Sequence, residues 1–312
     1  MAAKIRRLKI AVTLTVVLSL AIVLLVPPSL VTGVTSEVGS GGLPISTYDF
    51  TTIPQSVIED ASRLATELFG DYQEKRDEFA SQLLAMYSEA KDKDFVIFFN
   101  SGGSGWNLLE ASLGWYSIGT GITAELASLG YTSLSLDYLR TTKTWQGFFD
   151  ESMSMISLYP SKTKDLACRV EFLTNYIPDL RVILTGESNS TVICDRALNI
   201  LKDNPRVYSI QTGPPFWYKN TMLDRTLVLR SSGIVPDAFS EGDFFTMIGA
   251  TLEALLGFPQ PQDSSGNILY YVGAPGHEYW WQHPKVYSQI TKFLDENFGL
   301  DNTKPLVEGS SE

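Results

Sequence analysis

A serine lies where a strand-like segment gives way to a helix-like one, in the stretch "VILTGESNST" at residues 182–191. Apolar residues lead up to Gly186, and Ser188 follows just before an amphipathic run begins. A strand-to-helix turn of this kind can project a serine hydroxyl as a nucleophile. The same turn also suits a serine that caps the helix, so the motif alone does not decide between these roles. Ser188 is a candidate nucleophile only if a base and an acid accompany it.

The chain has 2 histidines, and one of them follows a strand-like stretch late in the sequence. His277 comes shortly after "ILYYV" at residues 268–272, where a base that takes the serine proton is expected. His283 precedes Pro284 and is better placed to end a turn before the last helix. We therefore predict that His277 is the base.

A carboxylate is needed to hold the histidine in one tautomer and to stabilise its protonated form. Asp237 follows the strand-like stretch "TLVLR", with Glu241 and Asp243 close behind it. We predict Asp237 as the acid and keep Asp243 and Glu241 as alternatives.

Glycines follow the first strand-like stretch, in "NSGGSGW" at residues 100–106. Gly102 and Gly103 allow a sharp turn whose N–H groups can face a developing oxyanion. A phosphate loop is the rival interpretation, but no GK[ST] follows. The pattern "GTGITA" at residues 119–124 matches GxGxxA, yet it does not follow a strand, so we do not assign a dinucleotide site.

Short apolar stretches alternate with amphipathic runs from residue 94 onward, which predicts a mostly parallel sheet flanked by helices, an α/β fold. The predicted strands span residues 95–99, 132–136, 182–186, 207–211, 226–230 and 268–272. Helices are expected at residues 166–176 and 191–201, and an additional helical segment precedes the sheet. In that segment Ser56 and Glu59 have the spacing of a capping box.

The order of these features resembles the α/β-hydrolase family over residues 92–299. The resemblance implies a Ser188, Asp237, His277 triad and an oxyanion hole from the N–H groups of Gly103 and Asn189. The chain departs from the family pattern at Ser190, where a glycine is usual, and at "NS" of residues 100–101, where many members have His-Gly.

Basic residues precede an uncharged apolar run at residues 10–26, and no acidic residue occurs before Glu37. The run has the minimum length for a membrane-spanning helix and lacks a clear cleavage site, which favours an uncleaved anchor over a signal peptide. The positive-inside rule then places the rest of the chain outside the cytoplasm, secreted if the segment is cleaved.

The predicted organisation has five parts: residues 1–28 as the N-terminal signal-anchor segment, 29–53 as a linker, 54–91 as the helical segment, 92–299 as the hydrolase-like domain, and 300–312 as a flexible tail.

A formal net charge of −11 argues against a nucleic-acid partner, because phosphate binding needs clustered basic residues. Cys168 and Cys194 lie in apolar helical patterns without CxxC spacing, which argues against zinc and dithiol chemistry but leaves a disulfide open. We expect neither a metal nor a cofactor.

Two functions from different classes remain. The first is a serine hydrolase acting on a small-molecule, lipid or peptide acyl substrate, by hydrolysis or by transfer to another acceptor. The second is a non-catalytic binding or scaffold protein, which would not need all three triad residues. Aromatic residues near the predicted site would suit an apolar acyl group, although core packing explains them equally well. They are Trp106, Trp145, Trp217, Tyr218, Tyr279, Trp280 and Trp281.

Overall fold

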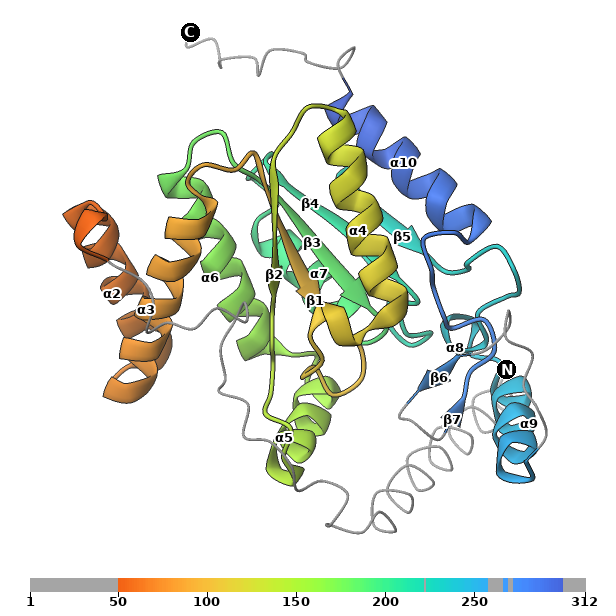
Figure 1. Ribbon diagram of the computed structural model, residues 1–312. Helices are drawn as coiled ribbons and strands as arrows, with labels where there is room; N and C mark the ends of the chain where they lie inside the picture. The colour runs from red at the N-terminus through yellow and green to blue at the C-terminus, as the bar shows by residue number, and fades with distance from the viewer. Residues whose placement is uncertain (1–49, 222, 258–265, 269–271, 300–312) are drawn as a thin grey trace, which may run out of the picture.

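The centre of the molecule is a five-stranded parallel sheet. The computed structural model describes residues 50–221, 223–257, 266–268 and 272–299. The strands are β1 (Phe95–Asn100), β2 (Ser133–Asp137), β3 (Arg181–Glu187), β4 (Val207–Thr212) and β5 (Thr226–Leu229), in the spatial order β2-β1-β3-β4-β5. Every neighbouring pair is parallel, which confirms the predicted α/β class (Figure 1).

Helices and a small hairpin make up the other described elements. The helices are η3 (Phe50–Thr52), α2 (Gln55–Phe69), α3 (Gln73–Ala90), η4 (Leu109–Ala111), α4 (Leu113–Ser128), α5 (Trp145–Ile156), α6 (Pro160–Tyr176), α7 (Ser190–Ile200), α8 (Ala238–Glu241), α9 (Phe244–Leu255) and α10 (Pro284–Phe298). The hairpin consists of β6 (Asn267–Ile268) and β7 (Val272–Gly273).

The sheet is covered on both faces, because alternate residues of its central strands join two different apolar clusters. In β1, Val96 and Phe98 pack with residues of α3, α6 and α7, whereas Phe95, Ile97 and Phe99 pack with residues of α4 and α10. Every residue of β1 is therefore buried. This burial explains why the strand is a continuous apolar run in the sequence rather than an alternating one.

The predicted N-terminal helical segment forms two helices that belong to the same core. The chain turns at Gly70, with a φ of +56°, between α2 and α3. Apolar residues of both helices join the cluster that includes α6. The predicted capping box is wrong: Pro54 occupies the N-cap position of α2 without a side-chain hydrogen bond, and Gln55 rather than Ser56 binds Glu59.

The sixth predicted strand, at residues 268–272, does not join the sheet. Ile268 and Val272 pair instead in the antiparallel hairpin of β6 and β7; residues 269–271 lie outside the described part. Both side chains pack against a small cluster that includes Phe239 and Met247. The apolar character that resembled a sheet strand thus serves contacts with α8 and α9.

No helix in the described ranges is long and apolar enough to cross a membrane. The predicted anchor at residues 10–26, most of the linker and the C-terminal tail lie outside those ranges. Cys168 and Cys194 are both buried and free, so the disulfide that the sequence left open is not formed.

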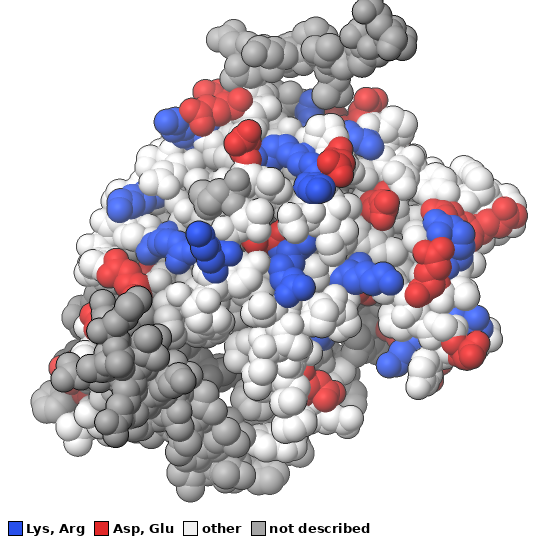
Figure 2. Space-filling view, turned by 180° about the vertical axis from the view of Figure 1, so that it is seen from behind, with Lys and Arg blue, Asp and Glu red and all other residues white. Residues whose placement is uncertain are grey.

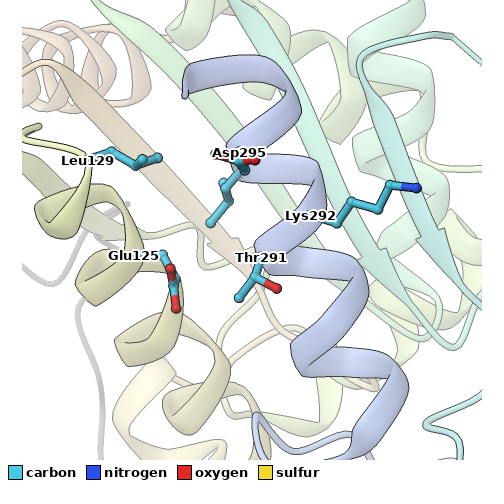
Figure 3. A pocket seen from close by; sticks show the side chains of 6 residues that line it. Glu125, Leu129, Thr291, Lys292 and Asp295 are labelled. Carbon is cyan, nitrogen blue, oxygen red and sulfur yellow. The ribbon is translucent and has the colours of Figure 1, made fainter. Parts of the chain in front are cut away.

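A hollow of about 390 Å³ lies between the C-terminal turns of α4 and α10 (Figure 3). Glu125, Thr291 and Asp295 are among the residues that line it. Because strands and helices run in opposite directions in a parallel α/β fold, this end of α4 is remote from the carboxyl edge of the sheet. None of Ser188, Asp237 and His277 lines the hollow, so we do not place the reaction there.

Candidate active site

Ser188 sits in a tight turn between β3 and α7. Its φ is +55°, a left-handed backbone conformation that is uncommon for a residue other than glycine. The N-cap position of α7 belongs to Asn189, so Ser188 does not cap the helix. Ser190, the departure from the family pattern, is fully buried and closes the turn: its Oγ accepts from the Glu187 amide at 2.7 Å and lies 2.7 Å from the Asn100 carbonyl oxygen. The geometry is that of a strained strand-to-helix turn with an available hydroxyl.

Asp237 and His277 form a buried pair. His277 Nδ1 lies 2.9 Å from Asp237 Oδ2 and 3.1 Å from Oδ1. The Asp237 carboxylate also accepts from the hydroxyls of Tyr279 at 2.7 Å and Ser240 at 2.9 Å, and from the amides of Phe239 and Ser240. With Nδ1 committed to the carboxylate as a donor, His277 has its other nitrogen, Nε2, available to accept a proton.

The end of β4 brings Ser188 and His277 to the same place. The Ser188 amide donates to the Thr212 carbonyl oxygen at 2.9 Å, and the His277 ring lies against the next residue, Gly213. Gly213 has a φ of +60°, and a Cβ atom there would lie 2.6 Å from His277 Cε1. A side chain at this position would therefore push the imidazole away.

The hydrogen bond expected between Ser188 and His277 is not made in this structure. His277 Nε2 is buried and has no hydrogen-bond partner among the residues that the structure describes. In the absence of substrate such catalytic hydrogen bonds are often long and tighten only in the complex. The structure therefore pairs His277 with Asp237 but shows no hydrogen bond from His277 Nε2 to Ser188.

The glycine turn after β1 lies against the serine turn. A Cβ atom at Gly102 would lie 3.2 Å from that of Ser188. Among the described residues, the amides of Gly103 and Asn189 donate no hydrogen bond. The side-chain oxygens Asn189 Oδ1 and Ser101 Oγ are also buried without partners. Buried polar atoms are normally paired, so these groups near Ser188 are available to bind a polar ligand or water.

A buried ionic network holds this glycine turn in place. The guanidinium of Arg140 donates to the carbonyl oxygens of Ser101 at 2.5 Å and Gly103 at 3.3 Å. Its charge is balanced by Glu151, which accepts at 2.9 Å and also binds Lys162. Asn189 completes the link, because its Nδ2 donates to the same Gly103 carbonyl at 2.8 Å. Arg140 thus acts on the glycine turn as a positioning residue.

The substitution Arg140→Lys should lower kcat for an activated ester by about tenfold or more with little change in KM, since a lysine cannot span two carbonyl groups and a carboxylate. Steady-state kinetics and thermal unfolding would be measured together. Arg63→Lys is the matched control, because Arg63 is exposed on α2 and pairs with its helix neighbours Asp60 and Glu67. Destabilisation with an unchanged kcat would show that Arg140 is merely structural.

The electrostatic environment keeps Asp237 ionised. Burial alone would raise its pKa, but the hydrogen bond and positive charge offered by His277, with the Ser240 amide and the Tyr279 hydroxyl, outweigh burial and lower the pKa below its ordinary value. Glu187 differs: burial raises its pKa, opposed by the Gly102 amide that donates to it at 3.2 Å and by His277. A carboxylate beside His277 is therefore maintained at Asp237 to a lower pH than in a free side chain.

The alternatives considered from the sequence lie elsewhere. Asp243 caps α9 through the amide and hydroxyl of Thr246, and His277 contacts Asp237 rather than Glu241. His283 occupies the N-cap position of α10, as its position before Pro284 indicated.

Some site residues were missed in the sequence. Tyr279 was grouped with the aromatics, but its hydroxyl binds the acid. Its spacing of two from His277 was the available signal, because alternate residues of an extended segment point to the same side. Arg140 and Glu151 gave no comparable signal, since nothing in their local sequence indicates a shared buried network.

No protein-family description matches the chain, and no curated protein matches it. Among solved structures, the chain is similar to Trichoderma reesei cutinase in complex with a C11Y4 phosphonate inhibitor. The two share 15% sequence identity, with a TM-score of 0.43, over 79% of this chain and 93% of that chain. The sheet order and the serine turn after β3 themselves agree with the α/β-hydrolase resemblance seen in the sequence.

Proposed function

We propose that the chain is a serine hydrolase that cleaves an ester, thioester or amide through an acyl-enzyme. One observation carries the proposal: a buried Asp237–His277 pair has its outer imidazole nitrogen unengaged beside a serine held at positive φ. A core histidine with a purely structural role would be expected to have both ring nitrogens satisfied. The arrangement instead has the parts that nucleophilic acyl transfer requires.

In the proposed acylation, Ser188 Oγ attacks the substrate carbonyl carbon while His277 Nε2 takes the hydroxyl proton. Asp237 holds the Nδ1–H and stabilises the resulting imidazolium. The amides of Gly103 and Asn189 stabilise the negative charge on the carbonyl oxygen, and neither amide donates to an acceptor in the described part of the chain. His277 then protonates the leaving group, which departs to give the acyl-enzyme.

In the proposed deacylation, His277 removes a proton from water, the water oxygen attacks the acyl carbonyl, and Ser188 leaves with the proton returned. An alcohol or amine in place of water would give acyl transfer with the same residues. As part of this proposal, the N-terminal apolar run anchors the chain to a membrane with the catalytic domain outside the cytoplasm.

The test is covalent labelling of the folded full-length chain with a fluorophosphonate, which reacts with an activated serine whatever the natural substrate. Peptide mass spectrometry should find the adduct on Ser188. A folded chain that takes up no label would contradict the hydrolase and favour the non-catalytic alternative.

A further inference from the structure

Helix α5 presents an apolar face to solvent. Its exposed residues Trp145, Phe149, Met153 and Ile156 recur at intervals of three or four, so they share one side of the helix. The opposite side carries Glu151, which is buried with Arg140. Ile156 is 75% exposed. Helix α5 thus has its ionic contacts inward and its large apolar side chains outward, the reverse of an ordinary surface helix.

Helix α9 also presents large apolar side chains to solvent. It exposes Phe245, Ile248, Leu252 and Leu255, again at intervals of three or four, and Phe245 is 91% exposed. Its other side packs Met247 into the cluster that supports the β6–β7 hairpin. Large exposed apolar patches of this kind mark surfaces that bind another apolar surface.

Both helices lie beside the proposed catalytic residues. On α5, Met155 Sδ lies 4.0 Å from Asn189 Nδ2. On α9, the ring of Phe244 lies 4.9 Å from that of Phe216, which packs against Phe239, whose ring lies 4.8 Å from His277. In Figure 1 the two helices lie at the end of the molecule toward which β1 and β2 point. Helices α5 and α9 therefore both lie close to the proposed catalytic residues.

We propose that the apolar faces of α5 and α9 dock onto a lipid surface and that the substrate is an acyl ester drawn from it. The substrate part rests on the proposed hydrolase function, whereas the docking part does not.

Charge and chain length favour lipid as the occupant. The two helices contain no Lys or Arg, which removes the charge attraction that an acidic partner would need. The lowest described part of the surface in Figure 2 is mostly uncharged, in contrast to the mixed charges above it. The apolar run at residues 10–26 is separated from Phe50 only by residues 27–49, which at up to about 3.5 Å per residue leave the domain within reach of the same bilayer.

A lipid surface also fits two separate convex helices, because a fluid bilayer adapts to each apolar face without a complementary shape. Helices of this kind lie in the plane of the interface with their apolar side chains below the headgroups. An uncharged docking face predicts binding to zwitterionic lipid that changes little with salt.

The direct test places an environment-sensitive fluorophore at position 245 through Phe245→Cys, in the full-length chain reconstituted into phosphatidylcholine vesicles. The native cysteines are buried, so the new thiol should react selectively. Brominated phosphatidylcholine should quench this probe but not a control probe introduced through Ile200→Cys, which is also exposed but lies at the far end of α7.

A probe at position 245 that brominated lipid does not quench would overturn the docking proposal. The same result is expected if residues 10–26 of the chain, rather than lipid, cover α9. Quenching that persists in Ser188→Ala would support docking independently of the reaction. If the probe is quenched but fluorophosphonate does not label the chain, the lipid-docking proposal is supported and the serine-hydrolase function is rejected.

A kinetic test asks whether docking onto lipid delivers the substrate to the active site. The double substitution Phe149→Ser and Phe245→Ser should lower hydrolysis of a vesicle-embedded long-chain ester about tenfold or more, with soluble acetate-ester hydrolysis unchanged. The matched control is Ile200→Ser, which should leave both rates unchanged. Equal loss on both esters, or no loss on the vesicle ester, would reject a lipid-derived substrate.

Discussion

Ser188→Ala is expected to abolish fluorophosphonate labelling and to lower ester hydrolysis by about 10³-fold or more, while the chain stays folded. The loss is large because no acyl-enzyme can form without the hydroxyl. Stability should change little: Ser188 is 8% exposed, and the hydrogen bonds that tie it to Thr212 and Thr191 run through its backbone atoms, which alanine keeps. Alanine also keeps the side chain within the volume of the turn.

Hydrolysis of a short activated ester, intact mass after labelling and circular dichroism would be measured on the same preparations. Ser128→Ala is the control, since Ser128 is exposed in the last turn of α4, far from the site. Equal labelling of the wild type and Ser188→Ala would place the reactive serine elsewhere and refute the proposed nucleophile.

His277→Gln is expected to lower kcat by about 10³-fold or more, because glutamine cannot carry the proton between Ser188 and the leaving group. Fluorophosphonate labelling should slow in parallel, since it depends on the same activated hydroxyl. The Asp237 carboxylate would keep the Tyr279 and Ser240 hydroxyls as donors, which limits the effect on folding.

His283→Gln supplies the matched control, being the same substitution at the other histidine. His283 lies at the N-cap of α10, and Asp237 pairs with His277 instead. Steady-state kinetics on both variants would separate the two positions. A reversed result, with His283→Gln inactive and His277→Gln active, would show that the base was misassigned.

The sheet could be predicted because its signal is local. The central strands β1 and β3 are buried on both faces and are therefore mostly apolar, and the other three strands are also short stretches with apolar residues, each set off by helical or turn patterns. The stretch at residues 268–272 was wrongly predicted as a strand of the sheet. Its described apolar residues, Ile268 and Val272, pack against the cluster that includes Phe239 and Met247, and the stretch has the same local pattern as a buried strand.

The serine turn was visible in the sequence although its last position is Ser190. Glycine is usual there because strand and helix approach closely, and a small hydroxyl that bonds back to the Asn100 and Glu187 carbonyls satisfies the same requirement. In the sequence, Asp237 is preferred over Asp243 because "SSGIVPD" at residues 231–237 resembles the turn that carries the acid in the α/β-hydrolase family. The structure gives this preference a physical basis, since Asp243 is committed to Thr246 as a helix cap.

The sequence by itself determined the α/β class, the serine turn and the positions from which an acid and a histidine would come, since each depends on contiguous residues and on the shared edge of parallel strands. Only the tertiary structure decided that Asp237 contacts His277, and that Arg140 binds the glycine turn through the carbonyl oxygens of Ser101 and Gly103. It also revealed that α5 and α9 turn their apolar faces outward. The first two features are contacts between residues that are distant in the sequence. The third depends on which face of each helix meets the core, and a local sequence pattern specifies neither kind of feature.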